Sequence, residues 1–138
     1  MNGNTKKLTL SLKKQWFEMT KAGIKSEDYR EINEYWTKRF LNTYFLKEKC
    51  VLPDFDAFVK HLNAGKIDLI NISELPYTCD FKVFNQNIMT LGYPKSTDTL
   101  RILKLEHKGI EIREGNPDWG AKPGKLYFVI KHGKIINE

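Results

Sequence analysis

The sequence predicts an α+β fold, with two or three helices ahead of or within a strand-rich sheet that curls or closes into a small barrel. Two patterns favour this class. Apolar residues recur at spacings of three and four in the first half of the chain, whereas apolar and polar residues alternate in the last third. Because the sequence contains no internal repeat and no linker-like segment, we expect one domain over residues 1–138.

Composition narrows the class of protein. The chain has 138 residues, of which 41% are hydrophobic and 12% aromatic, enough for one buried core and too many for a disordered chain. No apolar run approaches the roughly 18 residues of a membrane span. The polar segment 1–7 lacks the apolar stretch of a signal peptide. We therefore expect a cytoplasmic protein without a membrane partner.

The cysteines predict neither a disulfide framework nor a metal site. Cys50 and Cys79 are the only two, and the sequence has no CxxC pair and no histidine pair at zinc-ligand spacing. We expect reduced thiols, no metal and no cofactor.

The positive charge is concentrated near the start of the chain. The net charge is +6, and residues 1–50 contain 11 basic and 6 acidic side chains against 12 and 11 in residues 51–138. A one-sided positive field is compatible with a polyanionic partner. Solubility alone is the other explanation of the charge.

Strand and helix patterns alternate over the first third. Residues 7–12 alternate as a half-buried strand does, and Ser11 is a candidate cap for a helix over residues 13–22. Gly23 is typical of a helix end. Residues 26–32 predict a second strand.

Two further helices are expected in the middle of the chain. Asn33 is a suitable N-cap for a helix whose apolar residues span 35–45, with Tyr35 and Trp36 in the core. Asp54 is a candidate cap for the second helix. Residues 66–76 fit either a strand or a loop.

The last third predicts strands separated by turn residues. The strands expected there are residues 81–84, 100–105, 109–113, 126–130 and 134–136. The separating segments are a loop at 85–99, turns at 107–109 and 132–133, and a turn-rich connection at 116–124.

Residues 23–31 form the densest polar stretch. Strand alternation would place Lys25, Glu27, Tyr29 and Glu31 on one side, with Ser26, Asp28 and Arg30 on the other. Burial of a lone charge costs several kcal/mol, so any buried charges here must be paired or line a cavity.

This stretch supports two chemical interpretations and one structural alternative. A lysine between carboxylates and an apolar wall can act as a base or bind an acyl oxygen. An arginine beside an aromatic ring can clamp a phosphate or a stacked base. The alternative is an exposed edge strand whose opposite charges pair in solvent.

The pattern Gly-x-Lys-x-x-x-x-Arg over residues 23–30 resembles the signature of the ASCH domain family (activating signal cointegrator homology). Its position after a strand and a short helix is also similar to that family, especially to small bacterial and phage-borne members. Further segments that resemble those members are residues 10–17, 29–32, 35–39, 119–121, 127–130 and 133–136. Residues of about 46–78 match least and are expected to be a helical insertion.

The resemblance implies a PUA-like fold, which is a mixed β-barrel with flanking helices, and an association with RNA. Some compact relatives are amidohydrolases that remove the acetyl group from N4-acetylcytidine with a lysine, a threonine and a later glutamate. Lys25 and Arg30 match the lysine and arginine of that motif. Asp28 stands where the family has threonine, and Ser26 is a nearby hydroxyl. The candidates for the later glutamate are Glu106, Glu111 and Glu114.

We therefore expect a domain that binds RNA or a modified nucleotide; the alternative is a hydrolase of an acylated pyrimidine nucleoside. Lys25 and Asp28 are the catalytic candidates. The expected ligand-binding residues are Lys13, Lys14, Lys25, Glu27, Tyr29, Arg30 and Trp119. A third possibility is a phage or mobile-element accessory protein that only contacts other proteins. His61, His107 and His132 share no motif, so the sequence assigns them no catalytic role.

Overall fold

The computed structural model describes residues 6–45 and 77–136. The helix expected after Asp54 lies outside these residues, as does all but the end of the insertion expected at about 46–78. The chain forms two compact units, which we describe separately. Unit 1 comprises Met1–Asp28, Val83–Glu111 and Val129–Glu138, and unit 2 comprises Tyr29–Lys82 and Ile112–Phe128.

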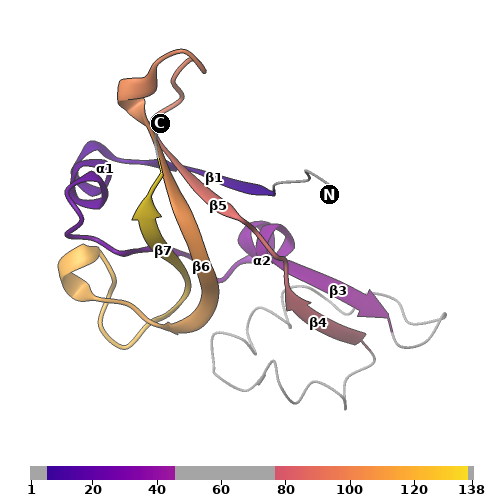
Figure 1. Cartoon of the computed structure of the whole chain (residues 1–138). Helices are drawn as coiled ribbons and strands as arrows, with labels where there is room; N and C mark the ends of the chain where they lie inside the picture. The colour runs from indigo at the N-terminus through magenta and orange to yellow at the C-terminus, as the bar shows by residue number, and fades with distance from the viewer. Residues whose placement is uncertain (1–5, 46–76, 137–138) are drawn as a thin grey trace. The chain divides into compact units, whose positions relative to one another are not determined.

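Helices and strands alternate in the first part of the chain, and long strands dominate the second (Figure 1). Their bounds are β1 Lys7–Leu12, α1 Lys14–Lys21, β2 Glu27–Arg30, α2 Glu34–Phe40, β3 Leu41–Phe45, β4 Tyr77–Phe81, β5 Gln86–Leu91, β6 Ile102–Glu114 and β7 Leu126–Ile135. Two 3-10 helices cover Thr99–Arg101 and Pro117–Trp119.

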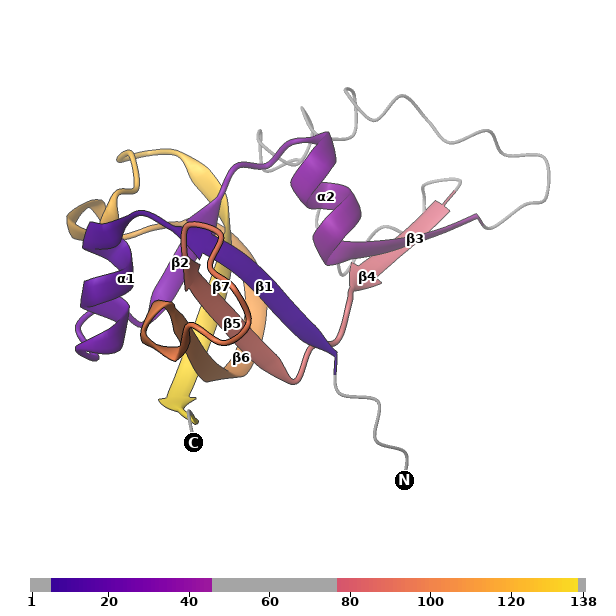
Figure 2. The ribbon, with the colours of Figure 1, turned by 90° about the horizontal axis from the view of Figure 1, so that it is seen from above.

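The strands form a curled five-stranded sheet in the order β1-β5-β6-β7-β2 and a two-stranded sheet of β3 and β4 (Figures 1 and 2). Strand β1 is parallel to β5, with Lys7 opposite Gln86, whereas β5 and β6 are antiparallel. Two helices accompany this mixed sheet, so the α+β class is confirmed. None of the helices in the described part of the chain has the length and apolar character that a membrane crossing requires.

The core of unit 1 follows from alternation along β1 and from the apolar side of α1. Leu8, Leu10 and Leu12 are buried, whereas Lys7 and Thr9 are exposed. Helix α1 adds the buried Phe17. A strand directs every second side chain to the same face, so this short segment specifies its own orientation.

The expected loop at residues 85–99 is wrong over its first half, because Gln86–Leu91 forms β5 in the interior of the sheet. Ile88 and Met89 are buried there. Pairing on both sides satisfies the backbone of this polar segment, which local composition could not reveal. Only Gly92–Asp98 and the following 3-10 helix form the connection to β6.

The turns expected at residues 107–109 and 132–133 are also wrong, because β6 and β7 continue through them. Gly109 has φ of 111° and allows β6 to continue through a backbone conformation that other residues rarely adopt. At Gly133, a Cβ atom would lie 2.9 Å from Cβ of Glu106. Glycine is required there by close packing against β6 and not by a turn. The cap expected at Ser11 is wrong too, since β1 extends to Leu12 and Lys13 is the N-cap of α1.

In unit 2, α2 begins as expected and ends earlier than expected. The Asn33 side chain accepts a hydrogen bond of 2.9 Å from the backbone N–H of Trp36, which confirms its role as N-cap. The helix ends at Phe40, and residues 41–45 form β3, which pairs antiparallel with β4. This long-range pairing satisfies the backbone of a segment whose apolar spacing also fits a helix.

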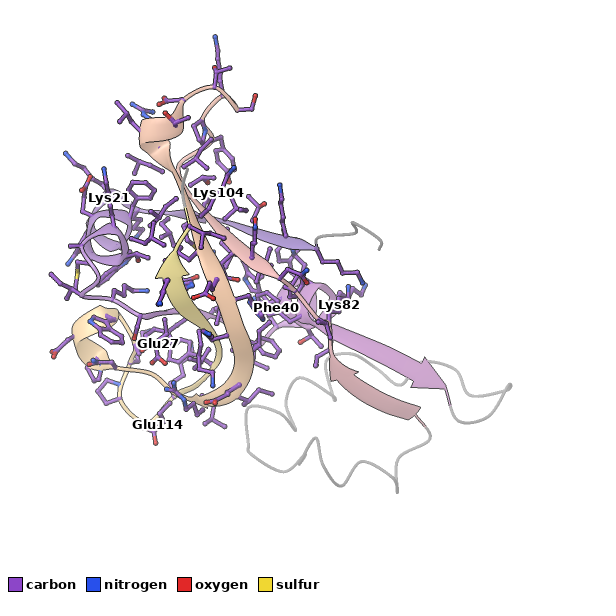
Figure 3. The ribbon with its side chains drawn as sticks, in the orientation of Figure 1. Lys21, Glu27, Phe40, Lys82, Lys104 and Glu114 are labelled. Atoms are coloured by element: carbon purple, nitrogen blue, oxygen red, sulfur yellow. The ribbon has the colours of Figure 1, made fainter. Side chains whose placement is uncertain are left out.

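Lys82 links the end of α2 to β4 (Figure 3). Its backbone N–H donates to the Phe40 carbonyl over 2.8 Å, and its Nζ donates to the Lys38 carbonyl over 2.9 Å. A cation at the carboxyl end of a helix is favoured by the helix dipole.

The strand expected at residues 81–84 is limited to Phe81, which is the last residue of β4.

Aromatic rings make much of the core of unit 2. Phe40 and Phe128 are fully buried, with ring centroids 5.2 Å apart in a T-shaped arrangement. Trp36 stacks on Phe40 itself, with ring centroids 5.3 Å apart. The turn-rich connection at residues 116–124 is confirmed: Asn116 caps a 3-10 helix, and Gly120 follows it with φ of 94°.

Candidate functional site

The Gly-x-Lys-x-x-x-x-Arg motif is divided between the two units. Gly23 to Asp28 belong to unit 1, and Tyr29 and Arg30 belong to unit 2. Gly23 has φ of 77°, which allows the chain to reverse at the end of α1. The backbone N–H groups of Ile24 and Lys25 then both donate to the Met19 carbonyl, at 3.0 and 3.1 Å. This tight turn fixes the point from which the Lys25 side chain starts.

Lys25 is buried and lies in a polar cluster with Asp28. Only 2% of Lys25 is exposed, and its Nζ lies 3.5 Å from Oδ1 of the buried Asp28. The same Nζ donates to the backbone carbonyl of Glu27 and lies 5.8 Å from the ring centroid of Trp16. Lys25 and Asp28 thus form a buried ion pair, and the alternative of solvent-exposed charges is wrong for these two residues.

Strand alternation had placed Lys25 and Asp28 on opposite sides, which is wrong. Strand β2 begins only at Glu27, so Lys25 precedes the alternating segment. Its side chain can therefore turn towards Asp28 while Ser26 between them is exposed. The sequence signal for this pairing is the i, i+3 spacing across the end of a turn.

A second polar group in unit 1 consists of Asn87, His107 and His132. The sequence pattern assigned no functional role to any of these three residues. Asn87 is 0% exposed, and its Nδ2 lies 3.2 Å from the Lys131 carbonyl and 2.7 Å from Nδ1 of His132. Its Oδ1 lies 2.7 Å from Nδ1 of His107. A carbonyl only accepts, so Lys131 fixes the orientation of the amide. It follows that His107 donates to Asn87, and that Asn87 donates to His132.

These hydrogen bonds determine where His132 carries its proton. Nδ1 accepts from Asn87, so the neutral ring is protonated at Nε2. Burial lowers the pKa of His132 to about 4; the charge of Asp28 raises this pKa, and that of Lys25 lowers it. Burial also lowers the pKa of His107. Among the described residues, none accepts a hydrogen bond from the buried Nε2 of His132.

Unit 2 contains a cluster of cations and aromatic rings, which we call the arginine–aromatic cluster: Arg30, Tyr35, Trp36 and Arg39. The guanidinium carbons of Arg30 and Arg39 lie 4.9 and 5.4 Å from the Trp36 ring centroid. Arg39 also lies 5.9 Å from the Tyr35 ring, and its Nη1 donates to the Tyr35 hydroxyl over 3.4 Å. The i, i+4 spacing of Tyr35 and Arg39 brings these side chains together on α2.

The expectation that Tyr35 lies in the core is wrong, since 60% of this residue is exposed. Its ring meets that of Trp36 edge-on at 4.8 Å. Trp36 is only partly buried, although it stacks on the core residue Phe40. Helical spacing alone does not separate such a half-buried aromatic surface from a core face.

Tyr29 holds the turn-rich connection in place. Its hydroxyl accepts a hydrogen bond of 2.9 Å from the backbone N–H of Asn116, and its ring lies 5.8 Å from that of Tyr127. A Cβ atom at Gly115 would approach the Tyr29 ring to 2.8 Å, so only glycine fits beside it. These contacts give Tyr29 a structural role in unit 2.

The remaining expected ligand residues are placed separately. Lys13 and Lys14 are exposed at the start of α1, and Glu27 is half-buried in β2. Trp119 is half-buried in the 3-10 helix whose Asp118 N–H donates to the Asn116 side chain. The structure therefore brings together Lys25, Asp28 and the Glu27 backbone, and it places Lys13 and Lys14 at the other end of α1 from that cluster.

The three candidates for a later glutamate each have a partner elsewhere. Glu106 accepts from the backbone N–H of Lys134 at 2.9 Å, and Glu111 Oε1 lies 2.6 Å from Nζ of Lys131. Glu114 accepts from the backbone N–H of Gly124 at 2.9 Å. Within residues 6–45 and 77–136, no three His, Cys, Asp or Glu side chains gather in a way that could hold a metal ion.

No protein-family model, no curated protein and no solved structure matches this chain. The resemblance to ASCH domains rests on the residues of the motif and its flanks.

Proposed function

We propose that this chain is a PUA-like domain that binds RNA or a modified nucleotide, and that the arginine–aromatic cluster is its main contact. The observation that carries the proposal is the position of two guanidinium groups, those of Arg30 and Arg39, over the single indole of Trp36. The mixed sheet with two helices and the motif that contains Arg30 support the PUA-like class.

The chemistry of the cluster suits a nucleic acid. An arginine stacked on an aromatic ring keeps its guanidinium plane fixed, so its N–H groups can bind a phosphate in a bidentate way. The exposed ring of Tyr35 offers a surface on which a base can stack. Both cations would attract a phosphate bound beside the ring.

The test is a titration of the full chain with fluorescent single-stranded RNA of about 12 nucleotides, a length that spans one binding groove of this kind. We expect the affinity to fall steeply between about 50 and 200 mM salt, because phosphate contacts release counterions. Arg30→Ala and Arg39→Ala should each weaken binding by about tenfold. Each should also reduce the slope of log affinity against log salt concentration by about one.

Lys108→Ala is the control, since Lys108 is an exposed cation of unit 1 paired with Glu106 at 3.9 Å. It should change the affinity by less than about threefold. Absence of RNA binding, or binding that neither salt nor the two cluster variants affect, would contradict the proposal.

A second candidate function is hydrolysis of an acylated pyrimidine nucleoside, and the buried pair of Lys25 and Asp28 favours it. A buried lysine cannot serve as an ordinary surface contact for phosphate, whereas a desolvated amine can take part in acid–base chemistry. The ring N–H at Nε2 of His132 is a further hydrogen-bond donor. The charges of Lys25 and Asp28 both act on this ring.

Acetate release from N4-acetylcytidine by the wild type and by Lys25→Met tests this second function. Turnover that the variant abolishes, with the fold retained by circular dichroism, would support it. Negligible release by the wild type would exclude this substrate.

A further inference from the structure

The connection between β5 and β6 in unit 1 exposes large apolar side chains at its surface. Tyr93 is 96% exposed and Leu100 is 78% exposed, and both lie in the segment of residues 92–101. Scattered exposed apolar residues are ordinary, but here an entire aromatic ring and a leucine belong to one short connection. The connection extends from the end of the sheet that lies at the top of Figure 1.

Hydrogen bonds hold this connection in one conformation. The Thr90 hydroxyl donates to the Gly92 carbonyl over 2.8 Å, and Gly92 has φ of 68°. The N–H of Asp98 donates to the Lys95 carbonyl over 2.9 Å. The N–H of Arg101 donates to the Asp98 carbonyl over 3.1 Å, and the two side chains form an ion pair.

The position of Tyr93 between Gly92 and Pro94 restricts its backbone. A residue before proline is confined largely to extended conformations. A tyrosine side chain has only two rotatable torsions before its hydroxyl, so binding to its ring requires little additional ordering. Tyr93 is therefore an exposed aromatic ring on a restricted backbone.

The charge of unit 1 indicates the class of partner. Its described residues (6–28, 83–111 and 129–136) include 12 Lys and Arg against six Asp and Glu. Lys95 is exposed two residues after Tyr93, and Arg101 is exposed at the end of the same connection. Aromatic rings with neighbouring cations are the combination that binds single-stranded nucleic acid, by stacking on bases and by attraction to phosphates.

We propose that Tyr93 is a second nucleic-acid contact of this protein, on which one base of a single strand stacks while Lys95 contacts the backbone. This inference rests on the proposed RNA-binding function. It adds a contact in unit 1 to the arginine–aromatic cluster in unit 2.

The experiment compares two oligomers of about eight nucleotides with the same number of phosphates, one of oligouridylate and one abasic. Tyr93→Ala should weaken binding of oligouridylate by about 5- to 100-fold, the loss typical of one base–aromatic stack, and leave the abasic oligomer unaffected. Tyr93→Phe should bind both oligomers within about twofold of the wild type, because the ring is retained. Lys95→Ala should weaken both oligomers to the same extent.

Val83→Ala is the control for loss of an exposed apolar side chain elsewhere in unit 1, because Val83 is 75% exposed. It should bind both oligomers as the wild type does. Unchanged oligouridylate binding by Tyr93→Ala would overturn the inference and leave this surface to a partner of another class, such as a protein. Equal losses for both oligomers would also overturn it, since Tyr93 would then act through the loop. If the wild type binds neither oligomer, the proposed RNA-binding function itself fails.

Discussion

The side chains of Asn87 and His132, 45 residues apart in the sequence, share a buried hydrogen bond of 2.7 Å in which the amide donates to Nδ1 of the ring. The Lys131 carbonyl, which accepts from the same amide nitrogen, fixes this direction. As a consequence, His132 carries its proton on Nε2 and is neutral at pH 7. The ring nitrogens Nδ1 of His107 and His132 therefore both depend on one amide.

Asn87→Ala should destabilise the protein by about 2 kcal/mol or more, because the variant leaves the buried His132 and the half-buried His107 without their partner. Urea unfolding followed by circular dichroism measures the effect. Asn85→Ala is the matched control; its side chain is exposed, so we expect a change within about 0.5 kcal/mol. Equal effects of the two variants would show that the network contributes no stability.

The free energy of unfolding should fall on mild acidification. The pKa of His132 is about 4 in the folded state and about 6.5 in an unfolded chain. The unfolded state therefore binds more protons between these values, so stability is fully present above about pH 6.5 and is lost as pH falls towards 4. The shift corresponds to roughly 3 kcal/mol. The lowered pKa of His107 acts in the same direction.

Urea unfolding at several pH values between 7 and 4.5 measures this dependence, because it gives the unfolding free energy at each pH. His132→Gln removes the titrating ring, so the slope should become smaller even if the variant is less stable at pH 7. A variant with the full slope of the wild type would assign the acid sensitivity to other groups.

Loss of either member of the buried Lys25–Asp28 pair should be costly. Lys25→Met or Asp28→Asn leaves its partner charged and buried, which typically destabilises a protein by about 3 to 5 kcal/mol. The double variant Lys25→Met/Asp28→Asn should recover part of that loss. A double-mutant cycle on unfolding free energies gives the coupling.

The exposed pair of Arg101 and Asp98 has the same distance of 3.5 Å and provides the comparison. We expect a coupling of about 0 to 1 kcal/mol for it, because solvent screens exposed charges. A buried pair that couples no more strongly than this one would show that Lys25 remains well solvated.

Gly115→Ala should destabilise unit 2 by about 1 to 3 kcal/mol, because the new methyl group would overlap with its neighbours. Its Cβ would lie 2.7 Å from Cβ of Ala121 and 2.8 Å from the Tyr29 ring. The double variant Gly115→Ala/Tyr29→Leu tests the cause by thermal unfolding. If the ring is the obstacle, the two changes together should cost less than the sum of the single variants.

The sequence alone determined the features that depend on a few neighbouring residues. Alternation from Lys7 to Leu12 predicted the buried face of β1, Gly23 the end of α1, and Asn33 the start of α2. The turn-rich connection after Asn116 was predicted as well. Each of these features is set by side-chain direction or hydrogen bonding within one turn, so its cause lies in the local sequence.

Only the tertiary structure decided the features that depend on pairing between distant segments. Asn87 belongs to β5 because that segment pairs with β1 and β6, and its amide then meets His107 and His132. Lys25 meets Asp28 because Lys25 precedes β2, which begins only at Glu27. Burial turns these polar residues into an ordered group, and burial is a property of the packed chain that no local pattern contains.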